Sequence, residues 1–332
     1  MKEEVWQTVC ELYKTYKFET SGQYDRLDVP KKPSRWTLRQ YFGPWKVMLQ
    51  KLKDSIPTLP DERKPPDEIA EQDEVRKLRE QIEGLRRHFN TPKHHLHLKG
   101  EVFSLGVVSD THVGSLFCDY GLLDAAYKIF KSRGIELVLH AGDFFDGQKM
   151  YRGHEFEVEV IGADEQVKLA VERYPYVEGI KTYFINGNHD RSFWKRAGVD
   201  IGQKITTVRP DIVYLGYQEE DIILGESFPV VIRLFHPEGT GSAYALSYLA
   251  QRYISELTSS NKPHILIHGH THKFNYMYYQ DVFVLQAGTL QRQTPFMRGK
   301  KIACHLGFSI LEITTTKQGI SRTSIEFFPC HD

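Results

Sequence analysis

The sequence predicts an α/β sandwich with a small helical domain at its N-terminus. Over the first 56 residues, apolar side chains recur at helical spacing only. From residue 98 onward, apolar runs of strand length alternate with helical segments, the order that builds a sheet covered by helices. Several of these runs end in short polar loops, where the sites of open α/β sheets collect. We expect a helical domain over 1–56, a charged linker helix over 57–97 and an α/β domain over 98–332.

Length and composition indicate a globular protein. The chain has 332 residues, of which 40% are apolar and 26% charged, and its 43 basic side chains balance 43 acidic ones. No apolar run approaches the ~20 residues that cross a bilayer. The N-terminus lacks the basic and apolar stretches of a signal peptide, and the four cysteines form no CxxC pair. We therefore expect a cytoplasmic protein with reduced thiols and no membrane association.

The N-terminal helical domain is basic. Between residues 29 and 53 there are seven basic side chains and no acidic one, and segment 1–53 carries 11 basic and 6 acidic residues, a net charge of +5. A capped helix that presents arginines suits contact with the phosphates and grooves of DNA. The alternative is a helical scaffold whose lysines only keep it soluble. The candidate nucleic-acid-binding residues are Lys31, Lys32, Arg35, Arg39 and Lys46.

This segment resembles the short helical repeat found beside homing endonucleases. The likeness covers about 40 residues and lies in TSGQYD at 20–25, Pro33-Ser34 and TLRQYFGPW at 37–45. After it, Val75, Leu78, Ile82 and Leu85 recur at helical spacing amid mixed charge. Two heptads are short for a coiled coil, so two alternatives stay open: a homodimer through the N-terminal and linker helices, or a linker helix that lies against one domain.

The region from residue 98 predicts nine strands and three helices. We expect strands over 102–108, 135–140, 180–185, 230–235, 264–268, 275–279, 282–286, 308–313 and 321–328. The helices are expected over 120–131, 158–173 and 243–254. The sequence contains neither a GxGxxG dinucleotide loop nor a GxxxxGK[ST] phosphate loop, which argues against those two cofactor classes.

Five polar motifs follow the ends of predicted strands. They are Asp110-Thr111-His112, Gly142-Asp143-Phe144-Phe145-Asp146, Gly187-Asn188-His189-Asp190, His236 and Gly269-His270-Thr271-His272. Each alone is commonly an ordinary turn or loop, but five in order at strand ends are hard to obtain by chance. Carboxylate, amide and imidazole groups together suit Mn, Fe, Zn, Co or Ni better than Ca or Mg, and we favour Mn. No cysteine joins the set, so a structural zinc site is excluded.

These motifs resemble the pattern of the calcineurin-like metallophosphoesterase family. That pattern is DxH, GDxxD, GNH[DE], a single His and GHxH, and the likeness covers roughly residues 100–315. The resemblance implies two mixed sheets flanked by helices, and two divalent metal ions per chain. One ion would be held by Asp110, His112, Asp143 and His272, and the other by Asp143, Asn188, His236 and His270. His189 would be the general acid or transition-state stabiliser, oriented by Asp146.

We therefore expect a metal-dependent phosphoesterase that hydrolyses phosphodiester bonds. Two cations about 3.5–4 Å apart bind phosphoryl oxygens and generate hydroxide at neutral pH. The basic run 29–53 favours DNA as partner and substrate, which would make the protein a nuclease. One alternative is a phosphomonoesterase or a small- or cyclic-nucleotide phosphodiesterase. A second is a DNA-binding protein with an idle metal centre, against which the complete ligand set counts.

Overall fold

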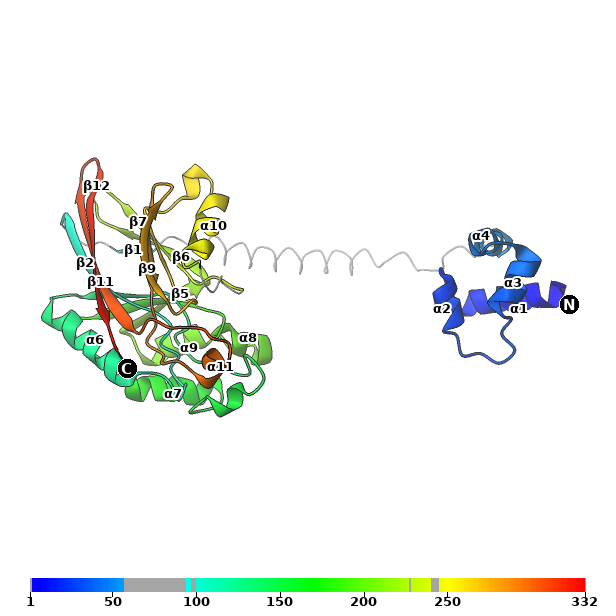
Figure 1. Ribbon diagram of the computed structural model, residues 1–332, viewed down its shortest axis with the longest axis horizontal. Coiled ribbons are helices and arrows are strands. Elements are labelled where there is room, and N and C mark those ends of the chain that lie inside the picture. The colour runs from blue at the N-terminus through cyan, green and yellow to red at the C-terminus, as the bar shows by residue number, and fades with distance from the viewer. Residues whose placement is uncertain (1, 57–93, 97–99, 227, 240–244, 332) are drawn as a thin grey trace, which may run out of the picture. The chain divides into compact units, whose positions relative to one another are not determined.

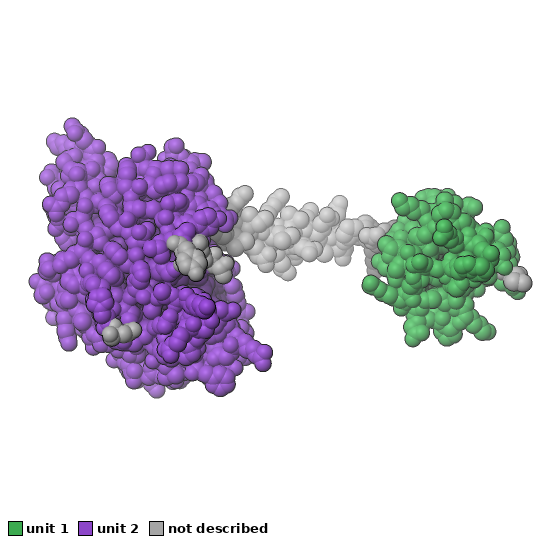
Figure 2. Space-filling view, viewed as in Figure 1, with its two compact units in different colours: residues 1–83 green, residues 84–332 purple. Residues whose placement is uncertain are grey.

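The computed structural model describes residues 2–56, 94–96, 100–226, 228–239 and 245–331 (Figure 1). The chain divides into two compact units, Met1–Glu83 and Gly84–Asp332 (Figure 2). Most of the expected linker helix, residues 57–93, lies outside the described residues. Its last part differs from the prediction, because His94–Leu96 forms strand β1 of the second unit. Within the described part of the chain, no helix has the length and apolar character needed to span a membrane.

The N-terminal unit is helical, as the sequence predicts. They are α1 (Lys2–Tyr16), α2 (Ser21–Asp25), α3 (Arg35–Phe42) and α4 (Trp45–Ser55). Side-chain caps fix two of the helix starts, because Thr20 accepts a hydrogen bond from the Gln23 amide and Ser34 accepts one from Thr37. Apolar side chains from all four helices meet in one buried cluster. Burial of that cluster holds together helices that are individually too short to be stable.

The second unit contains two six-stranded sheets. The strand order of the first is β1-β6-β7-β8-β10-β9, with bounds His94–Leu96, Glu219–Leu224, Val230–Phe235, Ile265–His268, Val282–Ala287 and Phe274–Tyr279. The order of the second is β12-β11-β2-β3-β4-β5, with bounds Gly319–Pro329, Gly307–Thr316, Val102–Val108, Leu137–His140, Lys181–Asn186 and Ile212–Tyr217. Both sheets mix parallel and antiparallel pairs, which confirms the predicted sandwich of two mixed sheets.

The two sheets share an apolar core and are covered by helices on their outer faces. Leu105 and Leu139 of the second sheet pack with Ile232 and Ile267 of the first in one buried cluster. A separate cluster joins the second sheet to α6, α7 and α9, and another joins the first sheet to α10 (Figure 1). The bounds of the helices in this unit are α6 Tyr120–Ser132, α7 Ala163–Arg173, α8 Arg191–Ala197, α9 Ile201–Val208, α10 Tyr248–Glu256 and α11 Pro295–Gly299. Two 3₁₀ turns, η1 and η2, span His154–Phe156 and Ser259–Asn261.

Several elements were missing from the prediction: β1, β5, β6, α8, α9 and α11. β6 shows why, because it begins Glu219-Glu220-Asp221, and acidic residues are depleted in strands. Tertiary pairing overrides that preference. Asp221 lies opposite Arg233 of β7, and the guanidinium of Arg233 donates to both carboxylate oxygens at 2.6 and 2.9 Å.

The topology gathers the polar motifs at one rim of the sandwich. β2, β3 and β4 are parallel neighbours in the second sheet, and β7 and β8 are parallel neighbours in the first. Each of these five strands is followed at its carboxyl end by one of the five motifs. Because parallel strands end at the same edge, residues up to 162 positions apart in sequence, such as Asp110 and His272, are brought together.

Candidate metal centre

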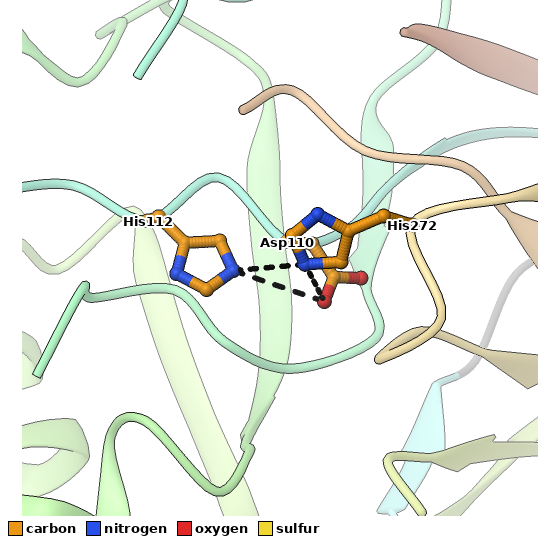
Figure 3. A group of neighbouring side chains, drawn as sticks. All are labelled: Asp110, His112 and His272. Atoms are coloured by element: carbon orange, nitrogen blue, oxygen red, sulfur yellow. Dashed lines mark hydrogen bonds and ion pairs between the residues drawn. The ribbon is translucent and has the colours of Figure 1, made fainter. Parts of the chain in front are cut away.

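The first cluster of the site, which we call the first half-site, is formed by Asp110, His112 and His272 (Figure 3). All three side chains are buried. His272 Nε2 lies 3.2 Å from His112 Nε2 and 3.3 Å from Asp110 Oδ1. Two imidazole nitrogens and a carboxylate oxygen therefore converge on one point, as the ligands of a cation do.

The second half-site is formed by Asn188, His236 and His270. His236 Nε2 lies 3.1 Å from the Asn188 side-chain oxygen and 3.1 Å from Asp143 Oδ2. His270 offers a ring nitrogen within 4.8 Å of ligand atoms of Asp143 and His236. These groups are less enclosed than those of the first half-site, because Asn188 and His270 are half-buried.

Asp143 lies between the two half-sites. Its Oδ2 is 3.1 Å from His236 Nε2 in the second half-site and 3.9 Å from His112 Nε2 in the first. Its Oδ1 accepts the main-chain N–H of His189 at 2.8 Å. This bond fixes the rotamer of Asp143, so one oxygen faces both half-sites. A shared carboxylate of this kind is the bridge that a two-metal centre needs.

The outer ring nitrogens of three histidines select their tautomers. His112 Nδ1 donates to Asp146 Oδ1 at 3.1 Å, His236 Nδ1 to the Ala141 carbonyl at 2.8 Å, and His270 Nε2 to the Gly239 carbonyl at 2.7 Å. Whenever such a ring is neutral, its inner nitrogen keeps a lone pair, the state that binds a metal ion. His272 is the exception, because its buried Nδ1 has no partner among the described residues.

The backbone at the site is strained. Twelve non-glycine residues in the described part of the chain have positive φ, and five of these belong to the half-sites or the bridge. They are Asp110 (49°), His112 (48°), Asp143 (50°), His270 (74°) and His272 (55°). Such conformations cost about 1–3 kcal/mol each and cluster at functional sites, because only an arrangement held by its surroundings keeps them. The sequence carries no signal for this strain.

A match to a protein-family model decides the family. Residues 103–306 match the model of the calcineurin-like phosphoesterase superfamily domain. The chain belongs to this superfamily. The family is metal-dependent, and the two half-sites supply the His and Asp groups that such an enzyme requires. Membership supports hydrolysis of ester bonds as the chemistry of this site.

Three known proteins are similar to this chain. DNA polymerase II small subunit of Methanothermobacter thermautotrophicus is 24% identical over 239 residues, 59% of this chain and 49% of that protein, so the chain spans about half the length of this curated relative. A solved archaeal phosphodiesterase is 15% identical, with 68% of this chain and 100% of that chain covered and a TM-score of 0.39. The phosphoesterase Yfce of E. coli is 16% identical, with 67% and 98% covered and a TM-score of 0.39.

The buried carboxylates and imidazoles of the site shift the pKa values of one another. Burial alone would raise the pKa of the Asp143 carboxyl, but His236 and His189 outweigh it and hold that pKa well below its usual range. Burial likewise opposes charge on His236, yet Asp143 and Asp110 raise the pKa of His236 to about 9. The imidazolium therefore neutralises the carboxylates where a cation would otherwise do so, which is the electrostatic mark of a cation site.

His189 stands beside both half-sites. Its ring packs edge-on against His112 with centroids 4.5 Å apart. The residue expected to orient it, Asp146, does so through the main chain: His189 Nδ1 donates to the Asp146 carbonyl at 2.6 Å, while the Asp146 carboxylate lies 3.9 Å away. Burial lowers the pKa of His189 to about 4, so the ring is neutral and its Nε2 carries a lone pair.

The Asp146 carboxylate has partners that the sequence prediction missed. Oδ1 accepts from His112 and from the Gln291 side chain at 3.3 Å, and Oδ2 accepts from His154 at 3.1 Å. Burial raises the pKa of Asp146, but the bonds from His112 and His154 outweigh it and lower the value to about 2. The one usable signal for His154 was its place in the loop that follows the GDxxD motif.

Asp190, the last residue of the GNHD motif, ties two ligand loops together. Its carboxylate accepts main-chain N–H groups from Phe144 and Phe145 at 3.2 and 2.7 Å, and from Gly187 at 2.7 Å. Gly187 allows close approach, because a Cβ there would meet the Asp143 carboxylate and His236 Nε2. The Asp190 carboxylate therefore fixes the spacing of the two loops that carry Asp143 and Asn188.

The five candidate nucleic-acid-binding residues belong to the N-terminal unit. The ammonium group of Lys32 donates to three main-chain carbonyls around the end of α2, at 2.5–3.0 Å. Arg35 is paired with Asp25 at 2.8 Å. Lys31, Arg39 and Lys46 are exposed. Lys32 and Arg35 therefore also have partners within their own unit, and all five residues stay candidates for contact with a polyanion.

Proposed function

We propose that this phosphoesterase is a dinuclear metal-dependent phosphodiesterase that acts on nucleic acid. The observation that carries the proposal is a pair of half-sites that share one carboxylate, Asp143. The first ion would be held by Asp110, His112, Asp143 and His272, and the second by Asp143, Asn188, His236 and His270. The mixture of imidazole, carboxylate and amide ligands suits Mn, which we favour, or Fe, Zn, Co or Ni.

The residues of the chain supply positioning and proton transfer. Two cations, when bound by these residues, would polarise the phosphoryl oxygens and lower the pKa of a water to near neutrality. His189 is held at the site by the Asp146 carbonyl, with its Nε2 available for a proton. The negative charge of a bound phosphodiester would raise the pKa of His189, so that Nε2 could take up a proton from water before the P–O bond breaks. His189 can then pass this proton to the leaving oxygen as a general acid.

Two observations support nucleic acid over a small substrate. The N-terminal unit presents Lys31, Arg39 and Lys46 to solvent, within a segment that has no acidic residue between positions 29 and 53. Exposed cations on a helical module are suited to phosphate contacts. The similarity to DNA polymerase II small subunit also favours a role connected with DNA.

One assay series tests the proposal. The full chain, supplied with Mn²⁺, is given p-nitrophenyl phosphate, bis(p-nitrophenyl) phosphate, a cyclic nucleotide and labelled DNA. We expect turnover of the bis ester and of DNA. Turnover of the monoester or the cyclic nucleotide alone would instead establish the small-substrate phosphoesterase.

A double variant tests the role of the N-terminal unit. Arg39→Ala/Lys46→Ala should raise the KM for DNA and flatten the salt dependence of binding, because fewer counterions are released. Lys2→Ala/Lys14→Ala removes two exposed lysines of α1, outside the basic segment, and is the matched control. Unchanged DNA affinity together with a changed oligomer size would favour the alternative, that this unit mediates a homodimer.

A further inference from the structure

We propose that two loops beside the metal centre, 147–157 and 292–302, bind single-stranded nucleic acid. In this proposal exposed cations of the loops contact phosphates, and Phe156 stacks on a base. The inference rests on the proposed function, since it names the form of nucleic acid that the metal centre receives. It also adds a binding surface in the second unit, distinct from the basic helices of the N-terminal unit.

The two loops are fastened to each other. The rings of Tyr151 and Phe296 stack with centroids 3.8 Å apart and planes inclined by 13°. Glu157, which is buried, accepts the Tyr151 hydroxyl at 2.5 Å and the Phe296 main-chain N–H at 2.9 Å. One carboxylate therefore bonds both loops, and they form a single pre-ordered surface, which lowers the entropy cost of binding.

The same loops are connected to the catalytic residues. A series of ring contacts runs from His189 to His154 at 5.8 Å, from His154 to Tyr151 at 4.8 Å, and from Tyr151 to Phe296. His154 is in turn bonded to Asp146. A strand that lies along these loops therefore reaches the His189 side of the metal centre, where the leaving group of a phosphodiester would be.

The loops carry cations without carboxylate partners. Six basic residues of the loops are exposed. Five of them, Lys149, Arg152, Arg298, Lys300 and Lys301, pair with no described acidic side chain, whereas the sixth, Arg292, is paired with Asp119 at 2.7 Å. Glu155 is the one exposed acid in the two segments. Several exposed arginines elsewhere in the second unit are paired, as in Arg133–Glu326 and Arg322–Glu312. Unpaired cations of one sign beside an anion-hydrolysing site attract a polyanion.

The exposed ring of Phe156 favours single-stranded nucleic acid over a duplex. It is 80% exposed, the highest value among the large apolar side chains of the described chain, and it lies two residues from His154. An exposed ring beside cations is the combination with which proteins hold single strands, because every base offers a face for stacking. Paired bases in a duplex do not offer that face. A protein partner is less suited, because lysine is depleted at protein interfaces.

A charge variant tests the phosphate contacts. In Arg298→Gln/Lys300→Gln/Lys301→Gln, the slope of log affinity against log salt for a single-stranded oligonucleotide should fall by roughly two, at ~0.7 for each phosphate that is no longer neutralised. Binding is measured with the full chain in chelator, so that no strand is cut. The matched control, Lys128→Gln/Lys168→Gln/Lys317→Gln, removes three exposed lysines from α6, α7 and the β11–β12 turn and should keep the wild-type slope. Equal slopes in both triple variants would overturn the proposal.

A ring variant tests stacking separately from charge. Phe156→Leu keeps an apolar side chain but removes the ring, so single-strand affinity should fall about 5- to 150-fold, equivalent to the ~1–3 kcal/mol of one base stack. The salt slope should not change, and Phe156→Trp should retain affinity. An equal loss of affinity for a duplex of the same length, or no loss for the single strand, would contradict the assignment.

Turnover separates this inference from the proposed function. With Mn²⁺, the Arg298→Gln/Lys300→Gln/Lys301→Gln variant should lose at least ~10-fold more kcat/KM on a single-stranded oligonucleotide than on bis(p-nitrophenyl) phosphate. If the wild type cuts the oligonucleotide and the variant loses equally on both substrates, the loops are not the binding surface although the function stands. If the wild type binds single strands and the triple variant shows the lower salt slope, but the wild type cuts no strand, the proposed function fails and the binding surface stands.

Discussion

The two half-sites of the metal centre differ in what holds their histidines. In the first half-site, His112 is held by the carboxylate of Asp146, which is itself bonded to His154. In the second, His236 and His270 are held by main-chain carbonyls, of Ala141 and Gly239. The orientation of the first half-site therefore depends on side chains that a substitution can remove. The orientation of the second depends on the path of the backbone, which point variants alter far less.

The two half-sites also differ in how deeply their side chains are buried. Every side chain of the first half-site is buried, whereas Asn188 and His270 of the second are half-buried. The enclosed half-site gains stronger electrostatics from its low dielectric surroundings and needs its outer hydrogen bonds to tolerate burial. The second half-site is therefore the more accessible of the two to solvent. Variants of the bridge, the neighbouring histidine and the Asp146 network should separate these contributions.

The largest effect is expected for the bridge. Asp143→Asn removes the charge shared by both half-sites, so both metal ions should be lost and turnover of bis(p-nitrophenyl) phosphate abolished. Elemental analysis after dialysis, with circular dichroism for the fold, checks this. Asp164→Asn, at an exposed carboxylate on α7, is the control and should keep both ions. Retention of one fully occupied site in Asp143→Asn would show that the half-sites do not depend on a common ligand.

The next largest effect is expected for His189, which belongs to neither half-site. His189→Ala should lower kcat by ~10²–10⁴-fold while both metal ions stay bound, since the ring supplies a proton rather than a ligand. The loss should be smaller for diesters with p-nitrophenol as leaving group than for those with an alkyl alcohol. Equal losses on the two classes of leaving group would make His189 a positioning residue.

The comparison also shows what the sequence could predict. The fold, the strand ends and the convergence of the motifs followed from apolar periodicity and from parallel topology, because these depend on residue type and spacing. The carbonyls of Ala141 and Gly239 have no such signature, since every residue carries one. Lys32 is a similar case, because the basic run predicts a phosphate contact but carries no signal that its ammonium group also donates to carbonyls of its own unit.

A smaller effect, confined to the first half-site, is expected when Asp146 is replaced. Asp146→Asn removes the charge that orients His112, so metal affinity of the first half-site should fall by ~10–100-fold. The second half-site, held by carbonyls, should keep its affinity. Titration of the dialysed protein with Mn²⁺, followed by calorimetry, should show one weakened step and one unchanged step. Two equally weakened steps would show that the Asp146 carboxylate supports both half-sites rather than the first alone.

The smallest effect is expected for His154, which acts on the first half-site through Asp146. Its Nδ1 accepts the Met150 main-chain N–H at 3.4 Å, so its Nε2 carries the proton that is donated to Asp146 Oδ2 at 3.1 Å. His154→Ala removes this donor and should weaken the first half-site ~3–10-fold, less than Asp146→Asn does, because Gln291 and His112 still hold Oδ1. His154→Gln offers an amide donor in place of the imidazole N–H and should recover part of the affinity.

A double variant decides whether His154 works through Asp146. If it does, Asp146→Asn/His154→Ala should lower the metal affinity of the first half-site no more than Asp146→Asn alone. The bond from His154 matters only through the carboxylate that Asp146→Asn has already removed. Additive losses would instead mean that His154 supports the half-site by packing of its own. The unfolding midpoint of each variant, measured beside its Mn²⁺ affinity, separates the two effects, because a packing defect lowers stability without the metal as well.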